Sequence, residues 1–154
     1  MVSRGTLGLA ALGLLLVASR GGRRRARPRV ARIPSPATAG LGLPFPGAVR
    51  VGDLLLLSGA IGHLPGALTL APGGVAAETH QALDNLEAVL RQEGLDLGDL
   101  VQCTLMLADI GEWPQVNAVW VERFAGARPA RSAFGTSGLA LGARIEIDGI
   151  ALAR

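Results

Sequence analysis

The chain has 154 residues, which is enough for one domain with a real core and too short for two domains of ordinary size. A content of 49% hydrophobic and 18% charged residues is typical of a folded globular protein and excludes an intrinsically disordered one. The single cysteine, Cys103, excludes an intrachain disulfide, so nothing in the composition requires an oxidising compartment.

The net charge of +3 is unevenly distributed along the chain. Residues 1–29 carry seven arginines and no acidic residue, a charge of +7. Residues 30–154 carry eight arginines and twelve acidic residues, a charge of −4. The basic character therefore belongs to the first segment, and the remainder has no basic stripe with interleaved aromatic residues. This pattern excludes a nucleic-acid-binding domain.

Residues 1–29 are predicted to be a targeting or anchor segment that precedes a domain over 30–154. An uncharged run of fifteen residues, 5–19, is shorter than the roughly 20 that a membrane span requires, but it suits the apolar region of a signal peptide. Six arginines follow directly and oppose simple export. An organelle transit peptide and a true start further downstream are the alternatives, and we favour membrane association or export. The domain itself is of a cytosolic type.

The first elements of the domain are predicted from turn signals. Residues 30–47 are rich in proline and indicate an extended lead-in. Gly52 and Asp53 separate two apolar runs and predict a two-residue hairpin in which glycine takes a positive φ. The short run Leu54–Leu57 favours a buried strand.

Two helices and three further strands follow. The periodicity predicts a helix over 75–93, a strand over 100–108 and a helix over 112–125. The helical faces are Ala82, Leu83, Leu86, Val89 and Leu90 in the first helix, and Trp113, Val116, Trp120 and Phe124 in the second. The strand directs Val101, Cys103, Leu105 and Leu107 to one side. Two terminal strands lie around 131–137 and 143–152.

The order β-β-α-β-α-β-β predicts an α+β fold, a mixed sheet with two helices packed on one face. The other face of the sheet is left without a cover. For a domain of this size, that indicates an oligomer.

Few residues of the domain offer catalytic chemistry. Cys103 with His63 or His80 is a conceivable nucleophile and base, but a cysteine on the apolar side of a strand is inert when buried. Two histidines 17 residues apart without clustered carboxylates do not have metal-ligand spacing, so we expect no metal site, and the glycine-rich stretches lack a phosphate-binding pattern. Arg131 and Glu146 remain, and the alternation around them alone favours two solvated surface charges.

Five stretches of the domain resemble the Rid proteins (RidA/YjgF, the reactive intermediate deaminases), in that family's order. They are LPFPGAVRVGDLLLLSGAIG, ETHQALDNLEAVLRQEGLDLGDLVQCTLMLADI, VNAVW, PARSAF and RIEIDGIAL. Each stretch alone is weak evidence, whereas five in the same order are strong. The resemblance extends over about residues 30–154.

The resemblance implies a chorismate-mutase-like fold and a homotrimer with its sheets facing a common centre. It also implies sites between subunits that hydrolyse reactive 2-imino acids from amino-acid metabolism to 2-oxo acids and ammonia, without a cofactor. The partners would be the small imino or oxo acid and two further copies of the chain.

The resemblance also implies roles for individual residues. Arg131 matches the arginine that holds the substrate carboxylate, and its planar fork suits bidentate binding. Glu146 matches the acid that positions or activates the attacking water. Ser58 and Gly59 match a strand-end pair near the ligand. Asn117 matches an asparagine of the second helix, for which substrate contact and anchoring of the helix are equally good readings.

Two positions depart from the family pattern. Many members have a tyrosine where this chain has Phe45, so a hydroxyl group is missing although the ring can still line the cleft. Ala133 replaces a cysteine of some members, which leaves a backbone contact at that position. These departures concern the choice of substrate. The main alternative to a deaminase is a non-enzymatic ligand-binding or regulatory trimer of the same fold, and the retained Arg131 favours the enzyme. A second alternative is an enzyme that hydrolyses a related amide or carbamate at the same cleft.

Overall fold

The computed structural model of the chain describes residues 29–126 and 128–153, and residues 1–28, with the predicted targeting segment, lie outside them. The strands are β1 (Val30–Ile33), β2 (Ala48–Val51), β3 (Leu54–Ile61), β4 (Leu100–Leu107), β5 (Ala130–Gly135) and β6 (Ile145–Leu152). The α-helices are α1 (Gly74–Arg91) and α2 (Trp113–Arg123), and short 3-10 turns lie at Pro36–Thr38, Leu97–Asp99, Ile110–Glu112 and Ala140–Gly142.

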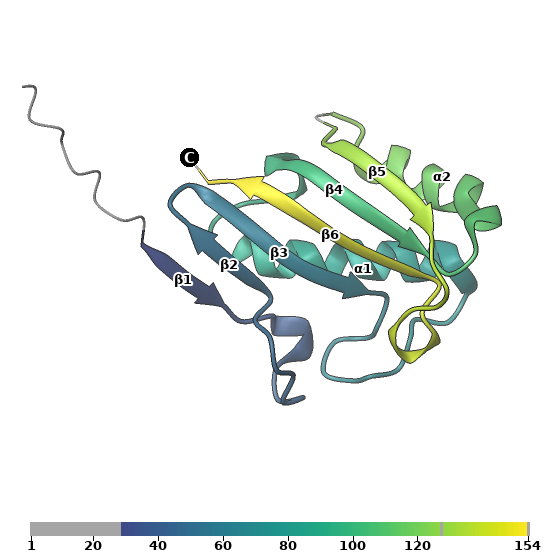
Figure 1. Cartoon of the computed structure of the whole chain (residues 1–154), viewed down its shortest axis with the longest axis horizontal. Helices are drawn as coiled ribbons and strands as arrows, with labels where there is room; N and C mark the ends of the chain where they lie inside the picture. Colours follow the sequence, from purple (N-terminus) through teal and green to yellow (C-terminus); the bar gives the residue numbers. More distant parts are fainter. Residues whose placement is uncertain (1–28, 127, 154) are drawn as a thin grey trace, which may run out of the picture.

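The six strands form one mixed sheet in the order β1-β2-β3-β6-β4-β5 (Figure 1). β4 and β5 are parallel and are connected through α2, whereas the other neighbours are antiparallel. The α+β architecture predicted from the sequence is confirmed. The predicted strand order lacked β1, which forms within the lead-in by pairing with β2 along the edge of the sheet.

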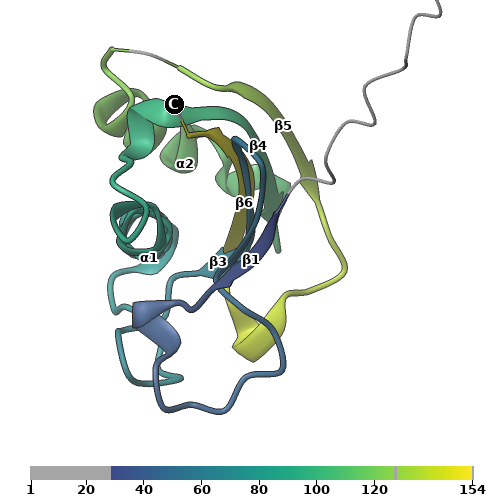
Figure 2. The same ribbon diagram turned by 90° about the vertical axis from the view of Figure 1, so that its left-hand side faces the viewer.

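Both helices pack on the same face of the sheet, as Figure 2 shows from the side. The core lies between the helices and the sheet. It is built from the apolar positions that the helical and strand periodicities predicted, including Leu83, Leu86 and Trp120 in the helices and Leu105 and Ile147 in the sheet. No helix within the described ranges is long and apolar enough to cross a membrane.

The turn predictions hold, and two burial predictions do not. Gly52 has φ +62° in the hairpin between β2 and β3. Leu55 and Leu57 of β3 are buried, but Leu54 and Leu56 face away from the helices and are exposed, so this strand is buried on one side only in a single chain. Val101 is also exposed, because a register shift between Leu100 and Gln102 interrupts the alternation of β4.

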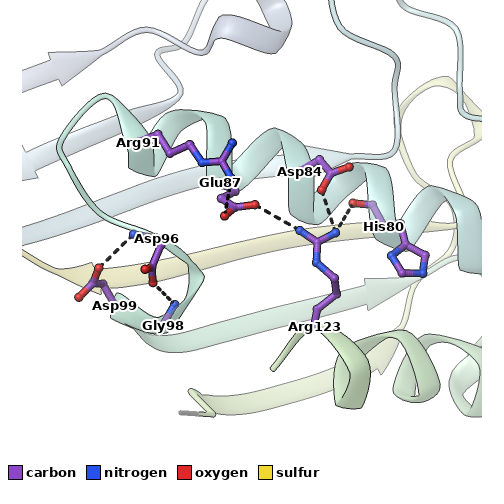
Figure 3. Close-up of polar contacts among 8 residues, drawn as sticks. All are labelled: His80, Asp84, Glu87, Arg91, Asp96, Gly98, Asp99 and Arg123. Carbon is purple, nitrogen blue, oxygen red and sulfur yellow. Dashed lines mark hydrogen bonds and ion pairs between the residues drawn. The ribbon is translucent and has the colours of Figure 1, made fainter. Parts of the chain in front are cut away.

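The two helices are joined by an arginine clasp at their surface (Figure 3). Arg123 of α2 lies 2.8 Å from the Asp84 carboxylate and 3.4 Å from the Glu87 carboxylate of α1, and it donates to the His80 carbonyl. Because this network is partly open to solvent, each pair contributes no more than about 1 kcal/mol. Its role is to fix α2 against α1, and α2 in turn positions the side chains around Arg131.

Candidate active site

Arg131 lies on β5 with its side chain under α2, where three residues of the helix hold it. Its guanidinium carbon lies 4.5 Å from the centre of the Trp113 ring and 5.0 Å from that of Trp120. Its Nη2 donates a 3.0 Å hydrogen bond to Oδ1 of Asn117. Stacking on two aromatic faces and one hydrogen bond fix the plane of the guanidinium before any ligand arrives.

The other terminal nitrogen of this group, Nη1, is buried and has no hydrogen-bond partner among the described residues. A buried donor of a charged group without a partner costs at least about 1–3 kcal/mol. Burial also lowers the pKa of the Arg131 guanidinium from its ordinary value, because it disfavours the charged form. An open recess of ≈ 420 Å³ lies at this group, lined by Ile110, Trp113, Arg131 and Ala133. This arginine recess is arranged to receive an anion.

Glu146 lies on β6, between β3 and β4, and its carboxylate reaches the irregular part of β3. The pairing of β3 with β6 shifts register between Leu57 and Ala60, so that Ile61 pairs with Glu146 and Gly59 lies beside the Glu146 carboxylate. A β-carbon added to Gly59 would lie 1.9 Å from Oε1 of Glu146, so any side chain there would displace the carboxylate. Gly59 is thus required for space rather than for its backbone torsion angles.

The Glu146 carboxyl group is partly shielded from solvent although it faces away from the core. Burial raises its pKa above the ordinary glutamate value, and the neighbouring Asp148 carboxylate raises it further. A carboxylate with a raised pKa is a better proton acceptor than an exposed one, which suits general acid–base chemistry.

A second recess of ≈ 260 Å³ surrounds Glu146. Gly59 and Phe45 lie at its wall, and Phe45 is 51% exposed. Ser58 fixes the segment that carries Phe45, because its hydroxyl donates to the Pro46 carbonyl at 2.8 Å and its backbone N–H donates to the Gly47 carbonyl at 2.9 Å. We call this the glutamate recess; its lining residues are Thr38, Leu43, Phe45, Gly59, Ile61, His63, Leu68, Ala140, Leu141 and Glu146.

The arginine recess and the glutamate recess lie on opposite faces of the sheet. Arg131 is paired with Cys103, which is buried beneath the helices. Glu146 is paired with Met106 and follows Ile145, whose side chain is buried on the helical side, so Glu146 points to the open face. β4 also lies between the two strands that carry them. The two recesses of a single chain are therefore separate, and each would be a half-site of any site that needs both.

The structure shows side-chain contacts that the sequence did not predict. Trp113 and Trp120 were predicted as core residues only, although their spacing on one helical face already places them together. Asn117 is half-buried on α2 and orients Arg131 by accepting its hydrogen bond. Burial raises the pKa of the Cys103 thiol to about 12, with a further contribution from Asp148, so this cysteine is a poor nucleophile.

Glu78 was not predicted and supports the start of β6. Its carboxylate is buried and accepts a 2.8 Å hydrogen bond from the backbone N–H of Arg144, two residues before Glu146. The Arg144 side chain in turn pairs with Glu112, with Nε 3.0 Å from a carboxylate oxygen. Through Arg144, these contacts join α1 and the turn before α2 to the start of the strand that carries the Glu146 carboxylate.

Comparison with known proteins gives a consistent result. The family described as Endoribonuclease L-PSP matches residues 37–153. The chain is 42% identical over 118 residues to a rat protein named 2-iminobutanoate/2-iminopropanoate deaminase, covering 77% of this chain and 85% of that protein. It is 38% identical over 132 residues to Protein DfrA of Myxococcus xanthus, covering 84% and 98%.

A solved structure has the same fold. The YjgF gene product of E. coli superposes with a TM-score of 0.72 at 32% sequence identity. The match covers 80% of this chain and 99% of that chain. The family match extends over most of the domain, and the architecture and the relatives agree with it. The chain belongs to the Endoribonuclease L-PSP family, the family of the Rid (RidA/YjgF) proteins.

Proposed function

We propose that the protein hydrolyses 2-imino acids to 2-oxo acids and ammonia. The observation that carries this proposal is the Arg131 guanidinium, which two tryptophans and Asn117 hold at the wall of an open recess and whose Nη1 has no hydrogen-bond partner among the described residues. A charged, oriented guanidinium of this kind suits a small carboxylate. The names of relatives at about 40% identity, 2-iminobutanoate/2-iminopropanoate deaminase, support the same chemistry.

In the proposed reaction, Arg131 binds the substrate carboxylate, and the adjacent C=N group then points toward Glu146. Stacking on Trp113 and Trp120 and the hydrogen bond to Asn117 hold the guanidinium in one orientation, so little ordering remains to be done on binding. A carboxylate in the recess accepts charge-assisted hydrogen bonds from the guanidinium, and at this partly buried group they are stronger than at an exposed arginine.

Glu146 would act on the water. Its carboxylate accepts a proton from the water as the oxygen attacks C2 of the imine, and passes that proton to the imine nitrogen, which gives a carbinolamine. The hydroxyl proton of the carbinolamine then moves through the same carboxylate to the nitrogen, the C–N bond breaks, and ammonia leaves as the C=O bond forms. The balance is one water consumed and one ammonia released, and no oxidant, reductant or cofactor takes part.

This reaction needs two copies of the chain, since the two half-sites lie on opposite faces of one sheet. The open face offers a surface for assembly: Leu54, Leu56, Phe134 and Leu152 are exposed on it in a single chain. Unburied apolar side chains grouped on one face are typical of an interface. We propose a ring of three copies in which the arginine recess of one copy meets the glutamate recess of the next.

A coupled assay tests the activity. An amino-acid oxidase releases a 2-imino acid, and a trapping amine competes with water for it. The protein should raise the rate of 2-oxo acid formation and reduce trapping in proportion to its concentration. Unchanged trapping at micromolar protein would contradict the deaminase and, if 2-oxo acids still bind, would favour the ligand-binding alternative.

The proposed assembly predicts the mass and its sensitivity to one side chain. Light scattering of a chain starting at Val30 should give three times the monomer mass. Leu56→Arg places a charge on the open face, which costs little in the monomer and much in an interface, so it should give monomers without deaminase activity.

Val121→Arg is the matched control, because Val121 is equally exposed but lies on α2, on the helical side of the sheet. It should keep both mass and activity. A monodisperse monomer for the unmodified chain would remove the shared site.

A further inference from the structure

The glutamate recess is more apolar than a site for the smallest imino acids requires. Leu43, Phe45, Ile61, Leu68 and Leu141 line it, and Glu146 stands among them. Its volume of ≈ 260 Å³ is close to the lower end of ligand sites, which begin at about 300 Å³. One water occupies about 30 Å³ in the liquid, so most of that space is left for a substrate side chain.

The loop that carries Leu68 into this recess is held in one conformation. The N–H of Leu64 donates to the Thr69 carbonyl at 2.8 Å, and His63 and Leu70 form a β-bridge. Asn85 of α1 anchors the start of the loop by donating to the carbonyls of Ile61 and His63. The exposed side chain of Leu68, at 49% exposure, is therefore presented by an ordered backbone.

Leu141 is presented to the recess at a conformational cost. Its φ of +58° lies in the left-handed region, the only such value at a non-glycine position among the described residues. This conformation costs about 1–2 kcal/mol for a residue with a β-carbon. The side chain is 53% exposed, so its burial in a single chain does not offset that cost. A strained, exposed leucine beside a functional carboxylate indicates a contact that a ligand would complete.

The chemistry of the substrate sets the direction of its side chain. In a 2-imino acid, C2 bears the carboxylate, the nitrogen and the side chain. The carboxylate is bound at Arg131 and the water acts from Glu146, so the first side-chain carbon lies next to Glu146. The surface available there is the apolar wall of the glutamate recess.

We infer that the recess selects 2-imino acids with bulky apolar side chains, such as those derived from leucine or methionine, over the small imines derived from alanine or serine. This inference rests on the proposed function. It assigns Leu68 and Leu141 as specificity-determining residues that contact the substrate side chain and take no part in proton transfer.

The experiment compares kcat/KM across imines released from alanine, leucine and methionine by an oxidase that accepts all three. We expect the leucine- and methionine-derived imines to exceed the alanine-derived imine by about 10-fold or more, because each buried methylene is worth roughly a factor of four. Equal values, or a preference for the smallest imine, would overturn the inference.

Two variants locate the effect. Leu141→Asn removes apolar surface. Asparagine tolerates a positive φ, so the backbone conformation at this position should be retained. Leu68→Ser does the same in the loop. Each should lower kcat/KM for the leucine-derived imine by about 5–20-fold and for the alanine-derived imine by less than about three-fold. Leu64→Ser is the control: Leu64 is an exposed leucine of the same loop that does not line the recess, and both substrates should be unaffected.

Binding of 2-oxo acids separates this inference from the proposed function. If no imine is hydrolysed but 4-methyl-2-oxopentanoate binds more tightly than pyruvate, and Leu141→Asn removes the difference, the recess is confirmed and the deaminase is not. If hydrolysis is found without side-chain preference, the deaminase stands and the inference fails. Loss of both turnover and preference would overturn both.

Discussion

Replacing Arg131 by lysine should lower kcat/KM for 2-imino acids by about 100-fold or more. Lysine keeps the positive charge but has no planar fork, so it cannot form two parallel hydrogen bonds to a carboxylate. Charge-assisted hydrogen bonds contribute about 1.5–3 kcal/mol each, and loss of two of them is worth at least two factors of ten. The loss should include weaker binding, because in the proposed reaction Arg131 contacts the carboxylate before and during the chemical step.

The measurement is steady-state kinetics combined with a titration of a 2-oxo acid, whose carboxylate has the same position. Arg91→Lys is the matched control, since Arg91 is an exposed arginine of α1 paired with Glu87. Its variant should change stability by less than about 0.5 kcal/mol and leave catalysis alone. Wild-type turnover for the Arg131 variant would mean that this arginine is a structural charge held under α2.

The architecture could be predicted because local signals decide it. Helical faces such as Leu83 and Leu86 in α1, or Val116 and Trp120 in α2, repeat with the period of the helix and are buried where that period places them. Gly52 marks the hairpin because a positive φ is favourable mainly for glycine. β1 has no such signal, since its pairing depends on a neighbouring strand and its residues are mostly exposed.

The site could be predicted only as a set of residues. Alternation in RIEID places Glu146 opposite Ile145 and Ile147, and the structure agrees. Its closeness to Gly59, however, follows from a register shift between two strands far apart in the sequence, which alternation cannot indicate. Likewise, the position of Arg131 between two tryptophans depends on how α2 lies on β5.

Glu146→Gln should lower kcat by roughly 10²–10⁴-fold with ligand binding largely retained. Glutamine keeps the size and hydrogen bonding of the side chain but cannot accept a proton from water. The contrast with Arg131→Lys is the informative part, because one variant should fail mainly in binding and the other in turnover. A 2-oxo acid titration reports binding for both.

The dependence of kcat/KM on pH in the unmodified protein should report the ionisation of Glu146. Glu146 must be ionised to accept a proton, so kcat/KM should rise with pH as Glu146 deprotonates. Because burial and Asp148 raise the pKa of Glu146, this rise should lie above the ordinary glutamate range. Asp148→Asn removes the smaller cause and should move the rise to lower pH without abolishing it. If the loss of activity at low pH is unaffected by Asp148→Asn and is still present in Glu146→Gln, it is caused by a group other than Glu146.

Mixing the two inactive variants should restore activity. In a cyclic trimer whose sites take Arg131 from one copy and Glu146 from the next, every mixed trimer contains about one site in three with both native residues. Coexpression of differently tagged Arg131→Lys and Glu146→Gln chains, followed by isolation of trimers that carry both tags, should therefore recover about one third of wild-type kcat at wild-type KM. If both residues of each site came from the same chain, no site in a mixed trimer would be intact and activity would stay at the level of the parents. The opposite orientation of the two side chains across the sheet predicts recovery, because β4 and the two faces of the sheet keep Arg131 and Glu146 apart within one chain.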